Sequence, residues 1–168
     1  MDAVAGVMSA TCGRGEAGGI LHDGAMQKAT RILLGMIGVA FAVSVVHYAD
    51  NYFNYDDYPQ PGPDDLPAPS ATVIGLAWFV FTAFGILGLW LWFRGRITAA
   101  AIALTGYSVS GLVGFGHYAT PGATDMVWWR QTHVIADIIC GIAIFGFAIW
   151  AAVKLPRDAT ADATRTAA

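Results

Sequence analysis

Three histidines and two aspartates in this chain have the types and spacing that metal chemistry needs: His47, Asp50, His117, His133 and Asp137. Each aspartate follows a histidine by three or four residues, so each of these two pairs shares one face of a helix. Imidazole and carboxylate groups are the usual ligands of zinc, and they also bind iron and copper. The five residues therefore predict a divalent metal site, with zinc expected first and iron or copper as alternatives.

The site predicts a reaction class as well as a ligand set. Three histidines with one aspartate would make a tetrahedral site. Either aspartate could be the fourth ligand, so all five residues are candidate ligands. If Asp50 and Asp137 instead orient the histidines and act in catalysis, a metal position stays open for water. Such a water can attack an ester or amide. We therefore expect a metal-dependent hydrolase acting on a lipid-associated substrate.

Two other interpretations of the same residues stay open. His133 with His47 or His117 could hold haem b between facing helices, as in an electron-transfer membrane subunit. The neighbouring aspartates argue against haem, because carboxylates rarely crowd the face of an iron porphyrin. Alternatively, the histidines and aspartates form only a hydrogen-bond network that braces the helix ends of a non-enzymatic accessory subunit.

The elements that must position these residues are long apolar runs. The chain is 56% hydrophobic and only 12% charged, whereas a soluble domain is about 25% charged. Runs of about 20 residues cross a hydrocarbon core of about 30 Å only as helices. The sequence predicts an all-α, up-and-down four-helix bundle, integral to the membrane, over residues 31–154. Its helices are expected at residues 31–50, 71–93, 97–118 and 127–153, with disordered tails at residues 1–30 and 155–168.

Basic residues predict the orientation of this bundle. Nearly all of them lie on the side of the two termini, and Arg130 is alone on the opposite side. Because positive residues stay inside, we expect cytoplasmic termini and a site that faces the extracytoplasmic side. Arginine outnumbers lysine and alanine and glycine abound, a composition typical of a GC-rich bacterium and hence of a bacterial plasma membrane. A net charge of -3 offers no surface for nucleic acid.

The five candidate residues are predicted to lie in one thin slab. Counting about 20 residues from the basic end of each run places His47 and Asp137 about 4 to 6 Å deeper than the other three. Polar groups in a membrane face the bundle interior. In the third run, Gly106, Ser110 and Gly114 precede His117 at helical intervals, which predicts a close helix contact.

The loop at residues 51–70 and the small-residue faces suggest partners. The loop holds five prolines and several aspartates. It forms either a lid over the site, with Asp56 or Asp57 as added ligands, or an acidic connector. Arg130 is expected to pair with a loop aspartate or with an anionic lipid headgroup. Besides the lipid bilayer and a lipid-like substrate, a second copy or another membrane protein could bind the small-residue faces.

Overall fold

The computed structural model describes residues 13–62 and 68–166, with side chains over residues 24–62 and 68–155. Over these residues every regular element is a helix. The α-helices are α1 (Gly13–Phe53), α2 (Ala71–Phe93), α3 (Ile97–Leu112) and α4 (Trp128–Thr166), and the short 3-10 helices are η1 (Tyr55–Asp57), η2 (Val113–Ala119) and η3 (Ala123–Asp125). The prediction of an all-α chain is confirmed.

Four helical segments are long and apolar enough to cross a membrane: Gly24–Phe53, Ala71–Phe93, Ile97–Ala119 and Trp128–Leu155. These segments match the four predicted runs. Both α1 and α4 extend beyond their predicted ends, α1 back to Gly13 and α4 on to Thr166. The remainder of the two predicted tails, residues 1–12 and 167–168, lies outside the described residues.

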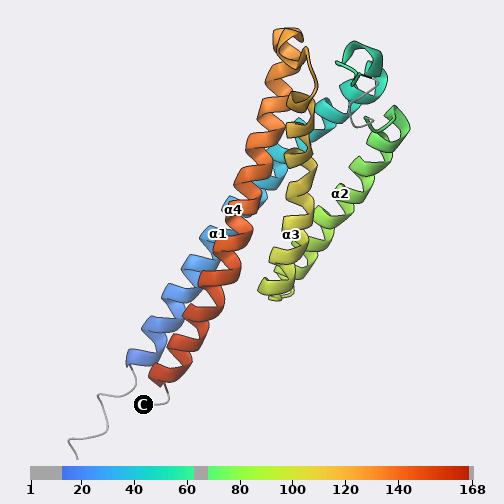
Figure 1. Cartoon of the computed structure of the whole chain (residues 1–168). Helices are drawn as coiled ribbons and strands as arrows, with labels where there is room; N and C mark the ends of the chain where they lie inside the picture. The colour runs from blue at the N-terminus through green and yellow to red at the C-terminus, as the bar shows by residue number, and fades with distance from the viewer. Residues whose placement is uncertain (1–12, 63–67, 167–168) are drawn as a thin grey trace, which may run out of the picture.

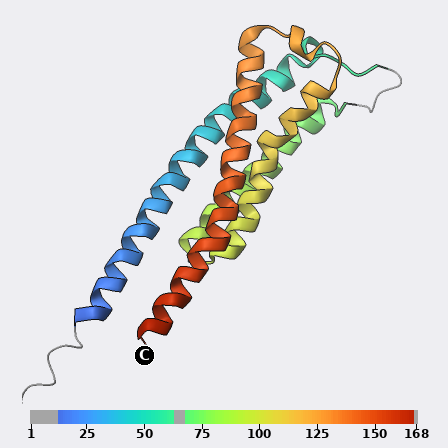
Figure 2. The same cartoon turned by 60° about the vertical axis from the view of Figure 1, so that its left-hand side comes forward.

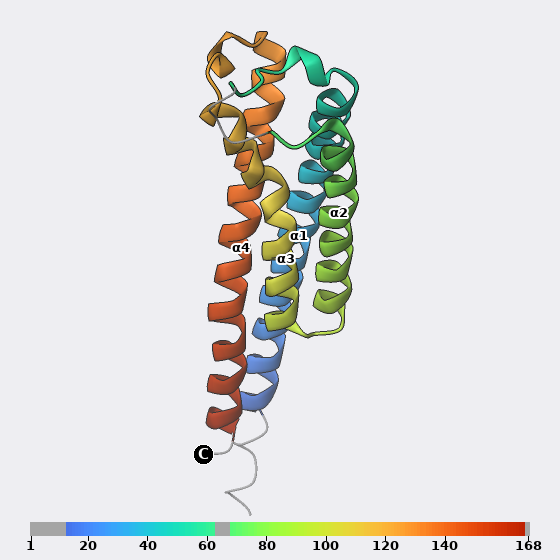
Figure 3. The same ribbon diagram turned by 45° about the vertical axis from the view of Figure 1, so that its right-hand side comes forward.

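Successive helices run in opposite directions, and each packs against two neighbours (Figure 1). The sides of the bundle are the α1–α2, α2–α3, α3–α4 and α4–α1 contacts. We call the end that carries η1, η2 and η3 the histidine end, and the opposite end the terminal end. Figures 2 and 3 show α1 and α4 continuing past the α2–α3 turn at the terminal end.

The α2–α3 turn depends on one glycine. Gly95 has a φ of 68°, a left-handed conformation that glycine adopts without a steric cost. The backbone N–H of Gly95 donates to the carbonyl of Trp92 at 2.9 Å, and the N–H of Arg96 donates to Leu91 at 3.0 Å. These bonds satisfy carbonyls at the end of α2 and reverse the chain within three residues.

Glycines also set the contact between α3 and α4. A Cβ atom added to Gly141 would lie 2.8 Å from the Ser108 carbonyl oxygen, and one added to Gly111 would collide with the Asp137 carbonyl. The two backbones therefore touch, as the small residues predicted. The faces differ in detail, because Gly111 rather than Gly106 makes this contact. Gly106 instead faces Phe84 of α2.

The interior is apolar toward the terminal end and polar toward the histidine end. Leu33, Leu104 and Ile144 are almost completely buried in the apolar part. The buried residues of helix α2, Gly85, Gly88, Leu91 and Trp92, all lie in its second half, and the partly buried Phe81 packs against this apolar part as well. The outward faces are strongly apolar: Ile102 is 70% exposed and Ile86 is 66% exposed.

Candidate functional site

Three imidazole rings from three different elements approach one another at the histidine end. His47 comes from α1, His117 from η2 and His133 from α4. The ring centre of His47 lies 5.4 Å from that of His117 and 5.4 Å from that of His133, both in edge-to-face arrangements. His47 is 3% exposed and His133 is 8% exposed. The rings of His117 and His133 thus each lie against the ring of His47.

The chain changes from the α-helix α3 to a tighter 3-10 helix before it reaches His117. After Leu112 the chain continues as the 3-10 helix η2, which has about three residues per turn. Gly114 and His117, three residues apart, therefore share a face. Gly114 packs under α4, where an added Cβ would lie 2.9 Å from the Ile138 side chain. This close approach brings His117 toward the α4 histidine.

The ring nitrogens divide into held and free atoms. His117 Nε2 lies 3.1 Å from the Asn51 amide nitrogen, which donates to it. His133 Nε2 lies 3.3 Å from Asp50 Oδ2, a contact without the alignment of a hydrogen bond. The Nδ1 atoms of His47 and His133 are buried and have no hydrogen-bond partner among the described residues. Buried polar atoms normally have a partner in the protein or in ordered water, so these two atoms are available to a water molecule or a ligand.

Asp50 anchors a network instead of standing free for a metal. It is 9% exposed, and its carboxylate accepts hydrogen bonds from Arg130 Nε at 2.9 Å, the Tyr58 hydroxyl at 2.6 Å and Asn54 Nδ2 at 2.7 Å. Three donors, two of them strong, use most of the lone pairs of a carboxylate. In this arrangement Asp50 positions its neighbours.

Arg130 is a central site residue whose burial the sequence analysis missed. Its side chain is 7% exposed and pairs with the equally buried Asp50, while a second bond of 3.1 Å reaches the exposed Asp57 carboxylate. The pairing with a loop aspartate was predicted, whereas the buried pair was not. One signal could have revealed it, since Arg130, His133 and Asp137 follow at intervals of three and four.

Tyr58 covers the histidines from the loop. It is 4% exposed, its ring centre lies 5.1 Å from that of His117, and the Arg130 guanidinium lies 4.9 Å from the same ring. Burial and the hydrogen bond to Asp50 raise the pKa of the Tyr58 hydroxyl well above its usual range. The phenol therefore stays protonated and acts as a donor. The loop up to Tyr58 forms a cover of the kind that the sequence analysis considered.

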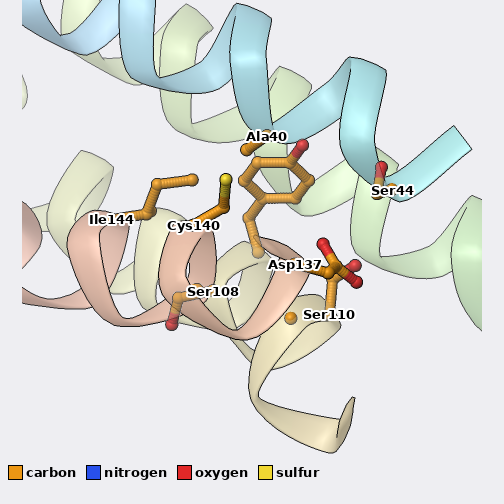
Figure 4. Close-up of a pocket in the computed structure, with 10 residues that line it drawn as sticks. Ala40, Ser44, Ser108, Ser110, Asp137, Cys140 and Ile144 are labelled. Atoms are coloured by element: carbon orange, nitrogen blue, oxygen red, sulfur yellow. The ribbon is translucent and has the colours of Figure 1, made fainter. Parts of the chain in front are cut away.

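Asp137 lies apart from the histidines. It is 2% exposed, and it lines a small cavity between α1, α3 and α4 together with Ser44, Tyr107, Ser110 and Cys140 (Figure 4). None of the three histidines lines this cavity. The structure thus brings His47, His117, His133 and Asp50 together and leaves Asp137 one helical turn inward.

The present rotamers do not form a finished metal site. Among the described residues, no three His, Cys, Asp or Glu side chains gather their donor atoms as a metal ion requires. Comparison with protein-family models, with curated proteins and with solved structures finds no match to this chain.

Proposed function

We propose that this chain is a multi-pass protein of a bacterial plasma membrane, an up-and-down bundle that binds a divalent metal ion through His47, His117 and His133. The observation that carries the proposal is the pair of buried, unpartnered Nδ1 atoms on His47 and His133, beside a third imidazole. A metal ion would supply the partner that the protein does not. Zinc is the first candidate, and iron and copper are the alternatives.

The exposed apolar surface supports the placement in a membrane. Phe79 of α2 is 65% exposed and Leu76 is 61% exposed, a pattern that suits lipid and not water. The basic residues near the terminal end favour cytoplasmic termini. The histidines would then lie near the extracytoplasmic surface, at the depth of lipid headgroups.

Ring spacing favours a metal ion over haem. Two imidazoles on one tetrahedral zinc have ring centres about 5 Å apart, because each zinc–nitrogen distance is about 2 Å. Two imidazoles on opposite faces of one haem iron stand more than about 6 Å apart. His47 lies 5.4 Å from both of its neighbours. To bring their nitrogens to one metal ion, the imidazole rings must rotate about χ2, which is a soft torsion for histidine.

Polar residues around the histidines would orient the imidazole rings for metal binding. Metal-binding histidines usually have their second ring nitrogen held by an oxygen of another group. Asp50 lies at that position for His133, and the Asn51 side chain lies there for His117. An amide nitrogen and oxygen are exchanged by a simple flip of the side chain, so Asn51 can accept from His117 once its Nδ1 binds a metal. Asp50 and Asn51 are then positioning residues.

A metal held by three histidines keeps a position open and, when bound, activates water for attack on an ester or amide. The site lies under the Tyr58 cover at the expected depth of headgroups, so we propose a lipid-like substrate. Arg130, next to the rings, is placed to attract an anionic headgroup when the loop with Asp57 moves aside.

Elemental analysis tests the metal. The protein, purified in mild detergent without a metal-affinity step, should hold about one equivalent of zinc, iron or copper. His133→Ala and His47→Ala should lose it, and His22→Ala, a histidine change in the first part of α1, should retain it. Wild-type protein without metal after incubation with each ion, or His133→Ala with a full equivalent, would sink the proposal.

One observation favours a second candidate, a non-enzymatic accessory subunit. The buried network of Asp50, Arg130, Tyr58 and Asn54 joins α1, the loop and α4, so it can brace this end of the bundle without any metal. This alternative predicts no bound metal, and it predicts that His117→Ala lowers thermal stability in proportion to lost packing. A visible spectrum of the same sample tests haem through its Soret band.

A further inference from the structure

The cavity beside Asp137 is a second polar site within the bundle. It has room for about one water molecule. Its lining includes Ala40 and Ser44 of α1, Tyr107 and Ser110 of α3, and Asp137 of α4, and Figure 4 labels all of these except Tyr107. The touching backbones of α3 and α4 fix two sides of the cavity.

The charge of Asp137 has no counterpart around this cavity. No lysine, arginine or histidine lines it. Arg130, toward the histidine end of the same helix, is already paired with Asp50 and Asp57. A buried carboxylate without a compensating charge is strongly unfavourable in a membrane. Asp137 must therefore either take up a proton or contact a bound cation.

Three oxygen atoms also lack hydrogen-bond partners here within the described part of the chain, and the Tyr107 hydroxyl is one of them. Asp137 Oδ2 and Ser110 Oγ are both buried, and neither has a partner among the described residues. A cation in the cavity could contact both oxygens, with the hydroxyl groups of Ser44 and Tyr107 close by. Carboxylate, hydroxyl and water oxygens are the ligands of hard cations.

We propose that this cavity binds a sodium-sized monovalent cation, held by the Asp137 carboxylate and the Ser110 hydroxyl. A single positive charge leaves the site neutral, whereas a divalent ion would leave an excess charge in an apolar interior. The cavity has water-sized room and hard oxygen donors, and both suit sodium. None of the three histidines lines the site, so it is independent of the proposed metal site.

Thermal unfolding in detergent tests the cation. The wild-type midpoint should rise in a saturable manner as sodium chloride replaces choline chloride at constant ionic strength, because the ion binds only the folded chain. Asp137→Asn, which keeps the shape of the side chain, should lose the sodium-specific rise. Asp125→Asn, a change of an exposed aspartate in η3, should keep it, and so should His133→Ala. Equal wild-type midpoints in the two salts would overturn the proposal.

Carbodiimide labelling separates a bound cation from a bound proton. Dicyclohexylcarbodiimide reacts with a protonated buried carboxyl group, so in choline chloride it should modify Asp137, as mapped by mass spectrometry. Sodium should reduce that modification several-fold in the wild-type protein, while a surface carboxyl group is labelled equally in both salts. Equal labelling of Asp137 with and without sodium would mean that the carboxyl group holds a proton, and the proposal would fail even if the asparagine variant does not fold.

Discussion

Replacing Arg130 by methionine removes the positive member of a buried ion pair and keeps most of the side-chain volume. In the wild-type protein both partners have side chains only 7% exposed, and their atoms are 2.9 Å apart. The variant leaves Asp50 with the Tyr58 and Asn54 hydrogen bonds but without a compensating charge. Its carboxylate must then stay charged in a poorly solvated place or take up a proton.

The expected cost is large because the pair is buried. Removing one partner of a buried pair destabilises a protein by about 3 to 5 kcal/mol, mostly through the charge left behind. The second ion pair gives an internal comparison, because the Asp57 side chain is 63% exposed. An exposed pair contributes about 0.2 to 1 kcal/mol. Arg130→Met should therefore lower the free energy of unfolding several times more than Asp57→Asn does.

Equilibrium unfolding in mixtures of mild detergent and dodecyl sulfate, followed by helical circular dichroism, measures both variants. A double variant with Arg130→Met and Asp50→Asn should be less destabilised than the sum of the single changes, because the uncompensated charge is gone. If Arg130→Met costs no more than Asp57→Asn, or if the two changes are additive, the account of a buried, coupled pair is refuted.

Three further predictions concern packing, titration and positioning. Gly141→Val should destabilise the chain by more than about 2 kcal/mol in the same unfolding assay, because its side chain would meet the α3 backbone, and a stability equal to wild type would contradict that contact. Because the pKa of Tyr58 is raised in the folded chain, its stabilising contribution is complete below pH about 10 and is lost as the pH rises further. The wild type should therefore lose more stability than Tyr58→Phe in a pH series above 10, and parallel curves would refute this. Asn51→Leu should weaken zinc binding about 10- to 100-fold in a competition titration, as for other groups that hold a metal-bound histidine, while unchanged affinity would exclude a positioning role for Asn51.

The helices were predictable because their signals are local. Helix α2 begins and ends at the predicted residues 71 and 93, since Ser70 caps its start by accepting from the Val73 N–H and Gly95 reverses the chain after its end. The change of α3 into a 3-10 helix after Leu112 was not predicted. The glycines at positions 114 and 116 weaken the α-helix there, and they were the available signal.

The separation of Asp137 from the three histidines could not be predicted from the sequence spacing. His133 and Asp137 share one face of α4, yet about 6 Å of helix rise separates them, and that is enough to place them beside different neighbours. Which neighbours they meet depends on how α1 and α3 are rotated about their axes. Contacts such as Gly111 against the α4 backbone set those rotations, and they become visible only when the helices are assembled.

The uneven burial of α2 along its length has a consequence for access to the interior of the bundle. All of its buried residues lie between Gly85 and Trp92. In its first half, the Trp78 indole donates to Ser44 at 3.2 Å, Gly75 lies against the Tyr52 ring, and Phe81 packs against the apolar interior. Movement of this half of α2 away from α1 would uncover Ser44, one turn of α1 from His47. If the chain lies in a bilayer as proposed, an amphiphile could then reach the polar interior from the side, between α1 and the first half of α2.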